Sequence, residues 1–253
     1  MKSYDEMIKE RRRLLKSQET EYEEWKPHQL KGIPPPPLEK PYPVNSRLID
    51  LPKPDDLNAG TISLKEVIER RQSHRKFKGD LLTLEELSFL LWSTQGVKSV
   101  AKNKAWTKRT VPSGGARHPF ETYLIVTRVE GLAPGVYRYL PLEHKLLLTI
   151  RNIRQLSDRL SAACYQQDFI SKSAVVFVWS AIPYRTEWRY SVLSYKDILI
   201  EAGHICQNLY LACEAIGAGT CAIAAYSQKL MDALIGIDGE DELTVYLAPV
   251  GKV

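Results

Sequence analysis

The stretch DILIEAGHICQNLYLACEAIG, residues 197–217, decides the fold class because it predicts one long helix near the centre of the protein. Apolar residues recur along it at steps of three and four, which is the period of an α-helix. The residues in register are Ile198, Ala202, Ile205, Leu209, Ala212 and Ile216. Gly217 stands where a helix-ending residue is expected. Because the helix is apolar on nearly every side, we expect it to lie in the core.

The segments around this helix predict a mixture of helices and strands. Ser63 and Thr83 are each followed three residues later by a glutamate, which is the capping-box signature of a helix start. Further helices are predicted over 151–164 and over 228–235, the latter with Ser227 as its N-cap. Buried strands are predicted over 122–129, 173–180 and 243–250, and a half-exposed strand over 135–141. Helices and strands do not alternate strictly, which predicts an α+β fold rather than a doubly wound sheet.

The composition changes near residue 60, so we divide the chain into residues 1–60 and a folded domain over 61–253. Residues 4–25 are charged and predict an amphipathic helix with a thin apolar stripe. Residues 31–56 are rich in proline, which excludes a helix and a central strand. Apolar residues between the prolines indicate that this segment lies along a surface, of this subunit or of a partner. We favour an arm that wraps over the protein.

The overall composition excludes several classes of protein. The 253 residues carry a formal net charge of +5, with 30 acidic residues spread among 35 basic ones, which does not indicate nucleic-acid binding. The first residues contain no apolar signal segment and no apolar run is long enough to span a membrane, so we expect a cytoplasmic protein. The four cysteines form no CxxC pair, and the single Glu-x-x-His step, Glu201 and His204, has no second copy. We therefore expect no metal site.

The basic segment RRQSHRKF, residues 70–77, admits two interpretations. Arg71, Ser73 and Arg75 occupy alternate positions, so in an extended chain their side chains point the same way. Two guanidinium groups and a hydroxyl then converge on one phosphate group. In this interpretation Arg70, His74 and Lys76 face elsewhere. The alternative is an ordinary solvated surface.

A second polar segment is RTVPSGGARHPFETYLIV, residues 109–126. Pro112 restricts the approach of the chain, and Gly114 and Gly115 remove side chains where the backbone can approach something flat. The alternative is a simple turn in which proline and glycine have only a conformational role. No GxGxxG or GxxxxGK[ST] motif is present, so neither a Rossmann nor a P-loop nucleotide site is expected.

Taken in order, several motifs resemble the FMN-dependent nitroreductase superfamily, and most closely its branch of SagB-type (ThcOx-like) dehydrogenases. The motifs are RxSxRxF at 71–77, LLWSTQGV at 90–97, PSGGARHPFE at 112–121, PGVYRYLPLEHKL at 134–146 and EAGHICQNLYLACEAIGAGTCAIAAYS at 201–227. The resemblance covers residues 60–253. It implies an α+β fold with a central, mainly antiparallel sheet flanked by helices. It also implies an intertwined homodimer that binds FMN at the subunit interface.

The resemblance further implies roles for individual residues. Arg71, Ser73 and Arg75 would hold the FMN phosphate, with Lys252 as the late basic residue that completes this site. The segment Pro112, Ser113, Gly114 and Gly115 would lie against the isoalloxazine ring. The backbone at Ala224 and Ala225, where the family often has glycine, would donate to the reactive ring nitrogen.

The implied activity is an FMN-dependent oxidoreductase that takes a hydride from NAD(P)H or an organic donor and reduces a nitro, quinone-like or other small acceptor. One alternative is a SagB-like azoline dehydrogenase acting on a modified peptide. Members with that activity carry a Lys-Tyr pair before the central helix, whereas this chain has Arg189 and Tyr190. Arginine does not release its proton near neutral pH, but Tyr190 could relay one. An alternative of another class is a non-catalytic flavin- or phosphate-binding protein.

Overall fold

A computed structural model describes residues 3–16 and 25–253. Within this part of the chain, seven strands form one sheet in the order β1-β6-β5-β4-β7-β9-β8, and every adjacent pair is antiparallel. The strands are β1 (Leu48–Asp50), β4 (Phe120–Val126), β5 (Gly135–Leu140), β6 (Lys145–Arg151), β7 (Val175–Ala181), β8 (Ala218–Thr220) and β9 (Leu243–Lys252). A separate hairpin pairs β2 (Val97–Val100) with β3 (Thr107–Arg109). The expected central antiparallel sheet is confirmed.

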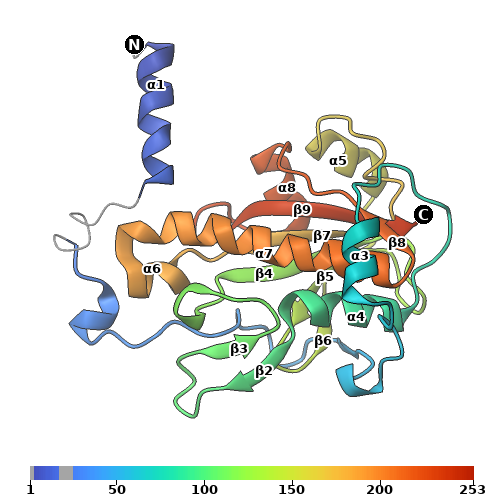
Figure 1. Cartoon of the computed structure of the whole chain (residues 1–253), viewed down its shortest axis with the longest axis horizontal. Helices are drawn as coiled ribbons and strands as arrows, with labels where there is room; N and C mark the ends of the chain where they lie inside the picture. Colours follow the sequence, from blue (N-terminus) through green and yellow to red (C-terminus); the bar gives the residue numbers. More distant parts are fainter. Residues whose placement is uncertain (1–2, 17–24) are drawn as a thin grey trace.

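Helices cover both faces of this sheet (Figure 1). The α-helices are α1 (Tyr4–Arg11), α3 (Leu64–Arg70), α4 (Leu84–Gln95), α5 (Leu156–Ala163), α6 (Tyr184–Tyr190), α7 (Ser194–Ala215) and α8 (Gln228–Ile235). Short 3₁₀ turns are η1 (Arg12–Leu15), η2 (His28–Lys31), η3 (Pro54–Asp56), η4 (Gly114–Ala116) and η5 (Ser191–Leu193). Helices α4 and α7 pack on one face, and α5 and α8 pack on the other.

The two faces of the sheet bury two separate apolar clusters, as the two-residue period of a strand requires. On β4, Leu124 and Val126 belong to the cluster under α4 and α7. Tyr123 and Ile125 alternate with them and belong to the cluster under α5 and α8. Because the central strands are covered on both sides, their sequences are apolar at nearly every position.

Most predicted elements form, and the helix ends show why. Thr83 and Glu86 make the complete reciprocal capping box of α4. At α3 only half of the box forms: the Ser63 hydroxyl accepts from the Glu66 amide, whereas the Glu66 carboxylate pairs with Arg70. Gly217 follows α7 with φ +63°, the left-handed conformation of a C-terminal cap.

The prediction that residues 135–141 form a half-exposed strand is wrong in its exposure. All six residues of β5 are buried, because β5 lies between β4 and β6. The polar residue of this strand, Arg138, is covered by the proline-rich segment, whose Lys40 and Pro41 carbonyls accept hydrogen bonds from Nη2.

The proline-rich segment lies along the domain of its own chain. Its β1 pairs with β6 at the edge of the sheet, and Trp188 of α6 donates a hydrogen bond to the Ile33 carbonyl (2.8 Å). Of the helix predicted over 4–25, α1 and η1 form over 4–15, and residues 17–24 lie outside the described residues. Among the described residues, no helix has the length and apolar character needed to cross a membrane.

A buried carboxylate joins the arm, the sheet and α6. Glu121 of β4 is 3% exposed and accepts hydrogen bonds from Arg185 Nη2 (2.6 Å) and from the Lys40 amide (2.9 Å). Arg138 Nε lies 3.8 Å from its other oxygen. Burial alone would raise the pKa of Glu121, but the two arginines and these hydrogen bonds hold its pKa below its ordinary value. Glu121 is therefore the charged centre on which three elements converge.

We expect Glu121→Gln to lower the free energy of unfolding by about 3–5 kcal/mol, because it leaves buried guanidinium groups without a counter-charge. Asp50→Asn is the matched control. It also removes one carboxylate from an ion pair with Lys145, but Asp50 is 86% exposed, so its effect is expected within about 0.5 kcal/mol of zero. Denaturant unfolding of both variants measures the difference, and equal effects would contradict a central role for Glu121.

Candidate functional site

The segment predicted to bind a phosphate, residues 71–75 and called the phosphate segment below, runs along the edge of the sheet at β8 and β9. Ser73 bridges Thr220, and the His74 amide donates to the Thr220 carbonyl at 2.9 Å. The side chains of Ser73 and Arg75 are exposed and that of Arg71 is partly exposed, so all three are accessible from solvent. Two neighbouring basic residues have other partners, because Arg70 pairs with Glu66 and His74 Nε2 lies 3.4 Å from Glu214 Oε1.

Tyr210 of α7 joins the phosphate segment to the segment that follows α7. Its hydroxyl lies 2.9 Å from Ser73 Oγ and accepts a hydrogen bond from the Ala222 amide at 2.8 Å. The guanidinium of Arg71 lies over its ring, 5.4 Å from the centroid. The sequence does not reveal this role of Tyr210, because a tyrosine in an apolar helix is typical of a core residue.

Beyond Ala222 the chain turns outward, and both Ala224 and Ala225 are exposed. The Ala225 carbonyl accepts from Gln167 Nε2 at 3.0 Å. Within the described residues, the amides of Ala224 and Ala225 have no hydrogen-bond acceptor, so they can donate to a ligand. Lys252 is the last residue of β9, which pairs with the edge strand β8. Its ammonium group binds the Glu86 carboxylate and the Ile216 carbonyl. Its assignment to a phosphate site stays a prediction.

The loop at 112–115 meets the residues predicted to be catalytic. Gly115 has φ +58°, and a Cβ atom placed there would lie 2.4 Å from Arg189 Cδ and 2.9 Å from the Tyr190 hydroxyl. Arg189 donates from Nε to the Tyr190 hydroxyl (3.2 Å) and from Nη1 to Gln29 Oε1 of the arm (3.4 Å). The glycine is therefore required both by the backbone conformation and by the close approach of α6.

A buried carboxyl group lies beneath this loop. Glu201 of α7 is 4% exposed, and its Oε1 accepts a hydrogen bond from the Gly114 amide at 2.7 Å. Burial raises the pKa of Glu201 to about 7, against the opposing effect of hydrogen bonds from Gly114 and Ser113. In the sequence this glutamate is visible only as an incomplete metal-binding step. Its contact with the loop depends on the tertiary structure.

The two groups of site residues lie on opposite faces of α7. Glu201 contacts the loop at 112–115, whereas Tyr210 contacts Ser73 and Ala222. Nine helical residues rise about 14 Å and turn through about two and a half revolutions. Accordingly, Figure 1 shows α6 at one end of α7 and α3 and β8 at the other. Within one chain the structure brings the phosphate segment together with the segment around Ala222, and the loop together with Arg189 and Tyr190, but it does not bring the two groups together.

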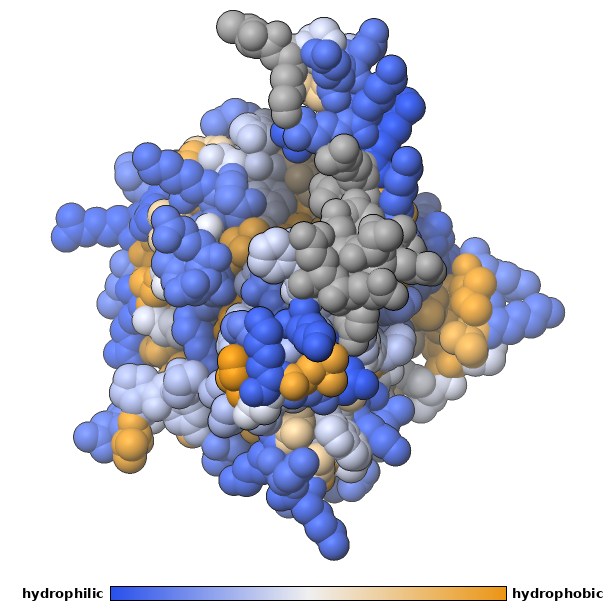
Figure 2. All heavy atoms as spheres, turned by 90° about the vertical axis from the view of Figure 1, so that its left-hand side faces the viewer, coloured by the Kyte–Doolittle hydropathy of each residue, from blue (hydrophilic) through white to orange (hydrophobic). Residues whose placement is uncertain are grey.

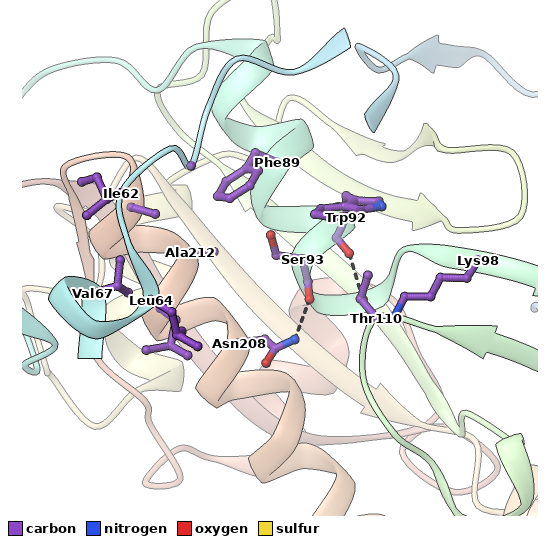
Figure 3. Close-up of a pocket in the computed structure, with 13 residues that line it drawn as sticks. Ile62, Leu64, Val67, Phe89, Trp92, Ser93, Lys98, Thr110, Asn208 and Ala212 are labelled. Carbon is purple, nitrogen blue, oxygen red and sulfur yellow. Dashed lines mark hydrogen bonds between the residues drawn. The ribbon is translucent and has the colours of Figure 1, made fainter. Parts of the chain in front are cut away.

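The protein surface at the α6 end of α7 differs in character from the surface on the side of α3. Viewed from the end that carries α6, the surface is largely hydrophilic and its apolar residues form separate patches (Figure 2). On the side of α3, a cavity of about 380 Å³ opens between α3, α4 and α7 (Figure 3). Phe89, Trp92 and Val67 make its walls mainly apolar, and Asn208 Nδ2 donates to the Ser93 carbonyl there at 2.8 Å. Its one titratable group is the exposed Lys98, so this cavity is suited to apolar contacts rather than to proton transfer.

Comparison with known proteins assigns the fold to a class of enzymes. The chain is 32% identical over 191 residues to a nitroreductase-like protein of Methanocaldococcus jannaschii, a match that covers 76% of this chain and 91% of that protein. A solved nitroreductase-type structure from Ralstonia eutropha is 25% identical with a TM-score of 0.66, covering 87% of this chain and 98% of that one.

The microcin B17-processing protein McbC of Escherichia coli is 27% identical over 168 residues, which cover 64% of this chain and 58% of McbC. The nitroreductase family model itself matches residues 68–252. The chain belongs to the nitroreductase family, and its relatives include peptide-processing proteins of the SagB type. The activity class of this family is that of an oxidoreductase.

We expect Gly115→Ala to lower the free energy of unfolding by about 1–3 kcal/mol, because a side chain at φ +58° is strained and its Cβ would overlap Arg189. Gly114→Ala is the matched control, because a Cβ atom there would lie 3.4–3.5 Å from its neighbours, which is ordinary contact. Urea unfolding of both variants measures the contrast. A Gly114 variant as unstable as the Gly115 variant would show that the loop is not packed against α6 as described.

Proposed function

We propose that this protein is an FMN-dependent oxidoreductase whose flavin-binding domain spans residues 61–253, with residues 1–60 as its arm. The observation that supports this most is the grouping of Arg71, Ser73 and the Ala222 amide around Tyr210, with the amides of Ala224 and Ala225, unpaired among the described residues, two and three residues further along the chain. Exposed guanidinium groups suit a phosphate, and free amides suit an electron-rich ring edge. These donors fit FMN in charge and in hydrogen-bonding chemistry.

In this proposal each segment has one task. Arg71, Ser73 and Arg75 hold the phosphate, and the amides of Ala224 and Ala225 donate to the reactive edge of the ring. When bound, FMN supplies hydride transfer between a donor such as NAD(P)H and a nitro, quinone-like or other small acceptor. The protein contributes binding, orientation and electrostatic stabilisation, because oriented N–H groups and arginines stabilise negative charge as it develops.

The opposite placement of the two groups supports a homodimeric site. The loop at 112–115 can lie against a flavin held by Arg71 and Ser73 if a second copy supplies that loop. Helix α7 has an exposed face that includes Leu199 (56%) and Ile200 (47%), and Gly203, one turn after Leu199, leaves room there for a close helix contact. We therefore propose that α7 packs against a second copy and that each flavin site combines residues of both chains.

Arg189 and Tyr190 would act on the substrate side of this shared site. The Tyr190 hydroxyl already accepts a hydrogen bond from Arg189 Nε, which stabilises its oxygen when it gives up a proton. A guanidinium group is a poor general base, so the part of Arg189 is to orient Tyr190 and to attract an anionic group.

The similarity to McbC favours a second candidate, an azoline dehydrogenase acting on a modified peptide. Arg189 in place of lysine argues against a base at that position, which makes the general oxidoreductase the preferred function. A direct assay separates them: rapid bleaching of bound flavin by NADH or NADPH supports the reductase, whereas turnover of an azoline peptide with dioxygen supports the dehydrogenase. A colourless protein that takes up no added FMN contradicts both and favours the phosphate-binding alternative.

We expect the double substitution Arg71→Ala and Arg75→Ala to weaken FMN binding by about a hundredfold or more, because two charge-assisted contacts to the phosphate are lost. Fluorescence titration of the apoprotein with FMN measures the affinity, and circular dichroism checks the fold.

The matched control is Arg70→Ala with Lys76→Ala. It removes the same two positive charges from the same segment, but Arg70 pairs with Glu66 on α3. FMN affinity in this control is expected within about threefold of the wild type after screening by salt. Equal losses in both double variants would show that the segment acts as a diffuse basic surface.

A further inference from the structure

Two acidic residues, Asp197 and Glu201, lie beneath the loop at 113–115 and have no role in the function proposed above. Asp197 and Glu201 are four residues apart and share one face of α7. A Cβ atom on Gly114 would lie 3.4 Å from Asp197 Oδ2, 3.4 Å from Tyr190 Cε2 and 3.5 Å from Glu201 Oε1. The loop that is proposed to contact the flavin thus lies directly on two carboxyl groups and on the Tyr190 ring.

Glu201 is bound to this loop at two points. Its Oε1 accepts from the Gly114 amide, and the Ser113 hydroxyl donates to its carboxyl group. The same Ser113 oxygen accepts a hydrogen bond from the His118 amide at 2.8 Å, which ties the two ends of the loop together. A side chain that is 4% exposed and holds both an amide and a hydroxyl of one loop determines the conformation of that loop.

We propose that Glu201 is a positioning residue that fixes the loop at 113–115 against Tyr190, and that it does so more firmly when it is ionised than when it is protonated. The physical reason is that an ionised carboxylate accepts stronger hydrogen bonds from an N–H and an O–H group than a neutral carboxyl does. The consequence for the enzyme, a loop whose contact with the flavin tightens as the pH rises, rests on the proposed function.

The charged groups around Glu201 support this assignment. Asp197 on its own helix raises the pKa of Glu201, and Arg109 of β3 lowers it. Arg189 of α6 lies against the next residue of the loop, Gly115. The pKa of Glu201 is raised to about 7 by burial, so it changes charge in the physiological range. Burial and then Arg109 lower the pKa of His118 to about 3, and burial lowers the pKa of Arg109 only to about 10, so neither of these changes charge there.

The direction of the effect on stability follows from proton linkage. Between pH 4.5 and about 7 the folded protein holds a proton on Glu201 that the unfolded chain has released. The free energy of unfolding therefore falls as the pH rises across this interval. Glu201→Gln keeps an oxygen for the Gly114 amide but cannot titrate. Its free energy of unfolding should show a shallower decline than the wild type between pH 4.5 and 7.

The decisive measurement is amide hydrogen exchange at Gly114 in the full chain without flavin, corrected for the intrinsic pH dependence of exchange. In the wild type we expect protection to rise about tenfold between pH 6 and pH 8. The hydrogen bonds from Gly114 and Ser113 lower the pKa of Glu201, so a local opening of the loop that breaks them while Glu201 stays buried becomes less favourable once Glu201 is ionised. Global unfolding has the opposite dependence, because it also exposes the carboxylate to water. Glu201→Gln should give intermediate protection that does not change with pH. Asp197→Asn should keep the step, which is the tenfold rise in protection, but at lower pH because a neighbouring negative charge is lost.

Protection at Gly114 that does not change with pH in the wild type, or a step that persists in Glu201→Gln, would overturn the proposal. So would a step that disappears in Asp197→Asn but not in Glu201→Gln. Because no flavin is present, this outcome is independent of the proposed function, which fails instead if the protein binds no FMN. Once flavin binding is shown, the pH profile of its reduction should lose its step near pH 7 in Glu201→Gln.

Discussion

The packing of one long helix against one face of an antiparallel sheet is the constraint on which the rest of the structure depends. Helix α7 buries Ile198, Ile205 and Leu209 against β4, β7 and β9, and each fully buried aliphatic side chain contributes about 1.5–3 kcal/mol. Because this packing fixes both the position and the rotation of α7, it also fixes where its polar residues emerge. Glu201 lies beneath the loop at 113–115, and Tyr210, nine residues later and on the opposite face of α7, lies beneath the phosphate segment.

The buried charge of Glu121 provides the second fixed point. Its ion pair with Arg185 anchors α6 to β4, and one helical turn later Arg189 of the same helix meets Gly115. The arm takes part in this arrangement, because Lys40 binds Glu121 and Gln29 accepts from Arg189. A segment whose prolines exclude a helix and a central strand thus completes the environment of α6 through its backbone and side-chain hydrogen bonds.

Elements with strong local signals were predictable from the sequence, and elements without them were not. Thr83 and Gly217 mark helix ends through capping that involves only nearby residues, and both act as expected. Helix α6 was missed, because its seven residues include Tyr184, Arg185 and Arg189 and show no apolar period; it is held by Glu121 and the arm. The exposure of β5 was misjudged because a strand sequence does not show that the arm will cover Arg138.

The sequence by itself determined the fold class, the family and the positions of the three segments that are proposed to bind the flavin, since each is a local pattern of residues. Only the tertiary structure decided which of these segments meet. Ser73 and Tyr210 are 137 positions apart, and Gly114 and Glu201 are 87 apart. Burial and hydrogen bonding across such distances depend on how α7 packs on the sheet. That packing makes Tyr210, which looks like a core residue in the sequence, a link between two segments that are proposed to bind the flavin. It also places Glu201, an isolated glutamate in the sequence, under the loop at 113–115.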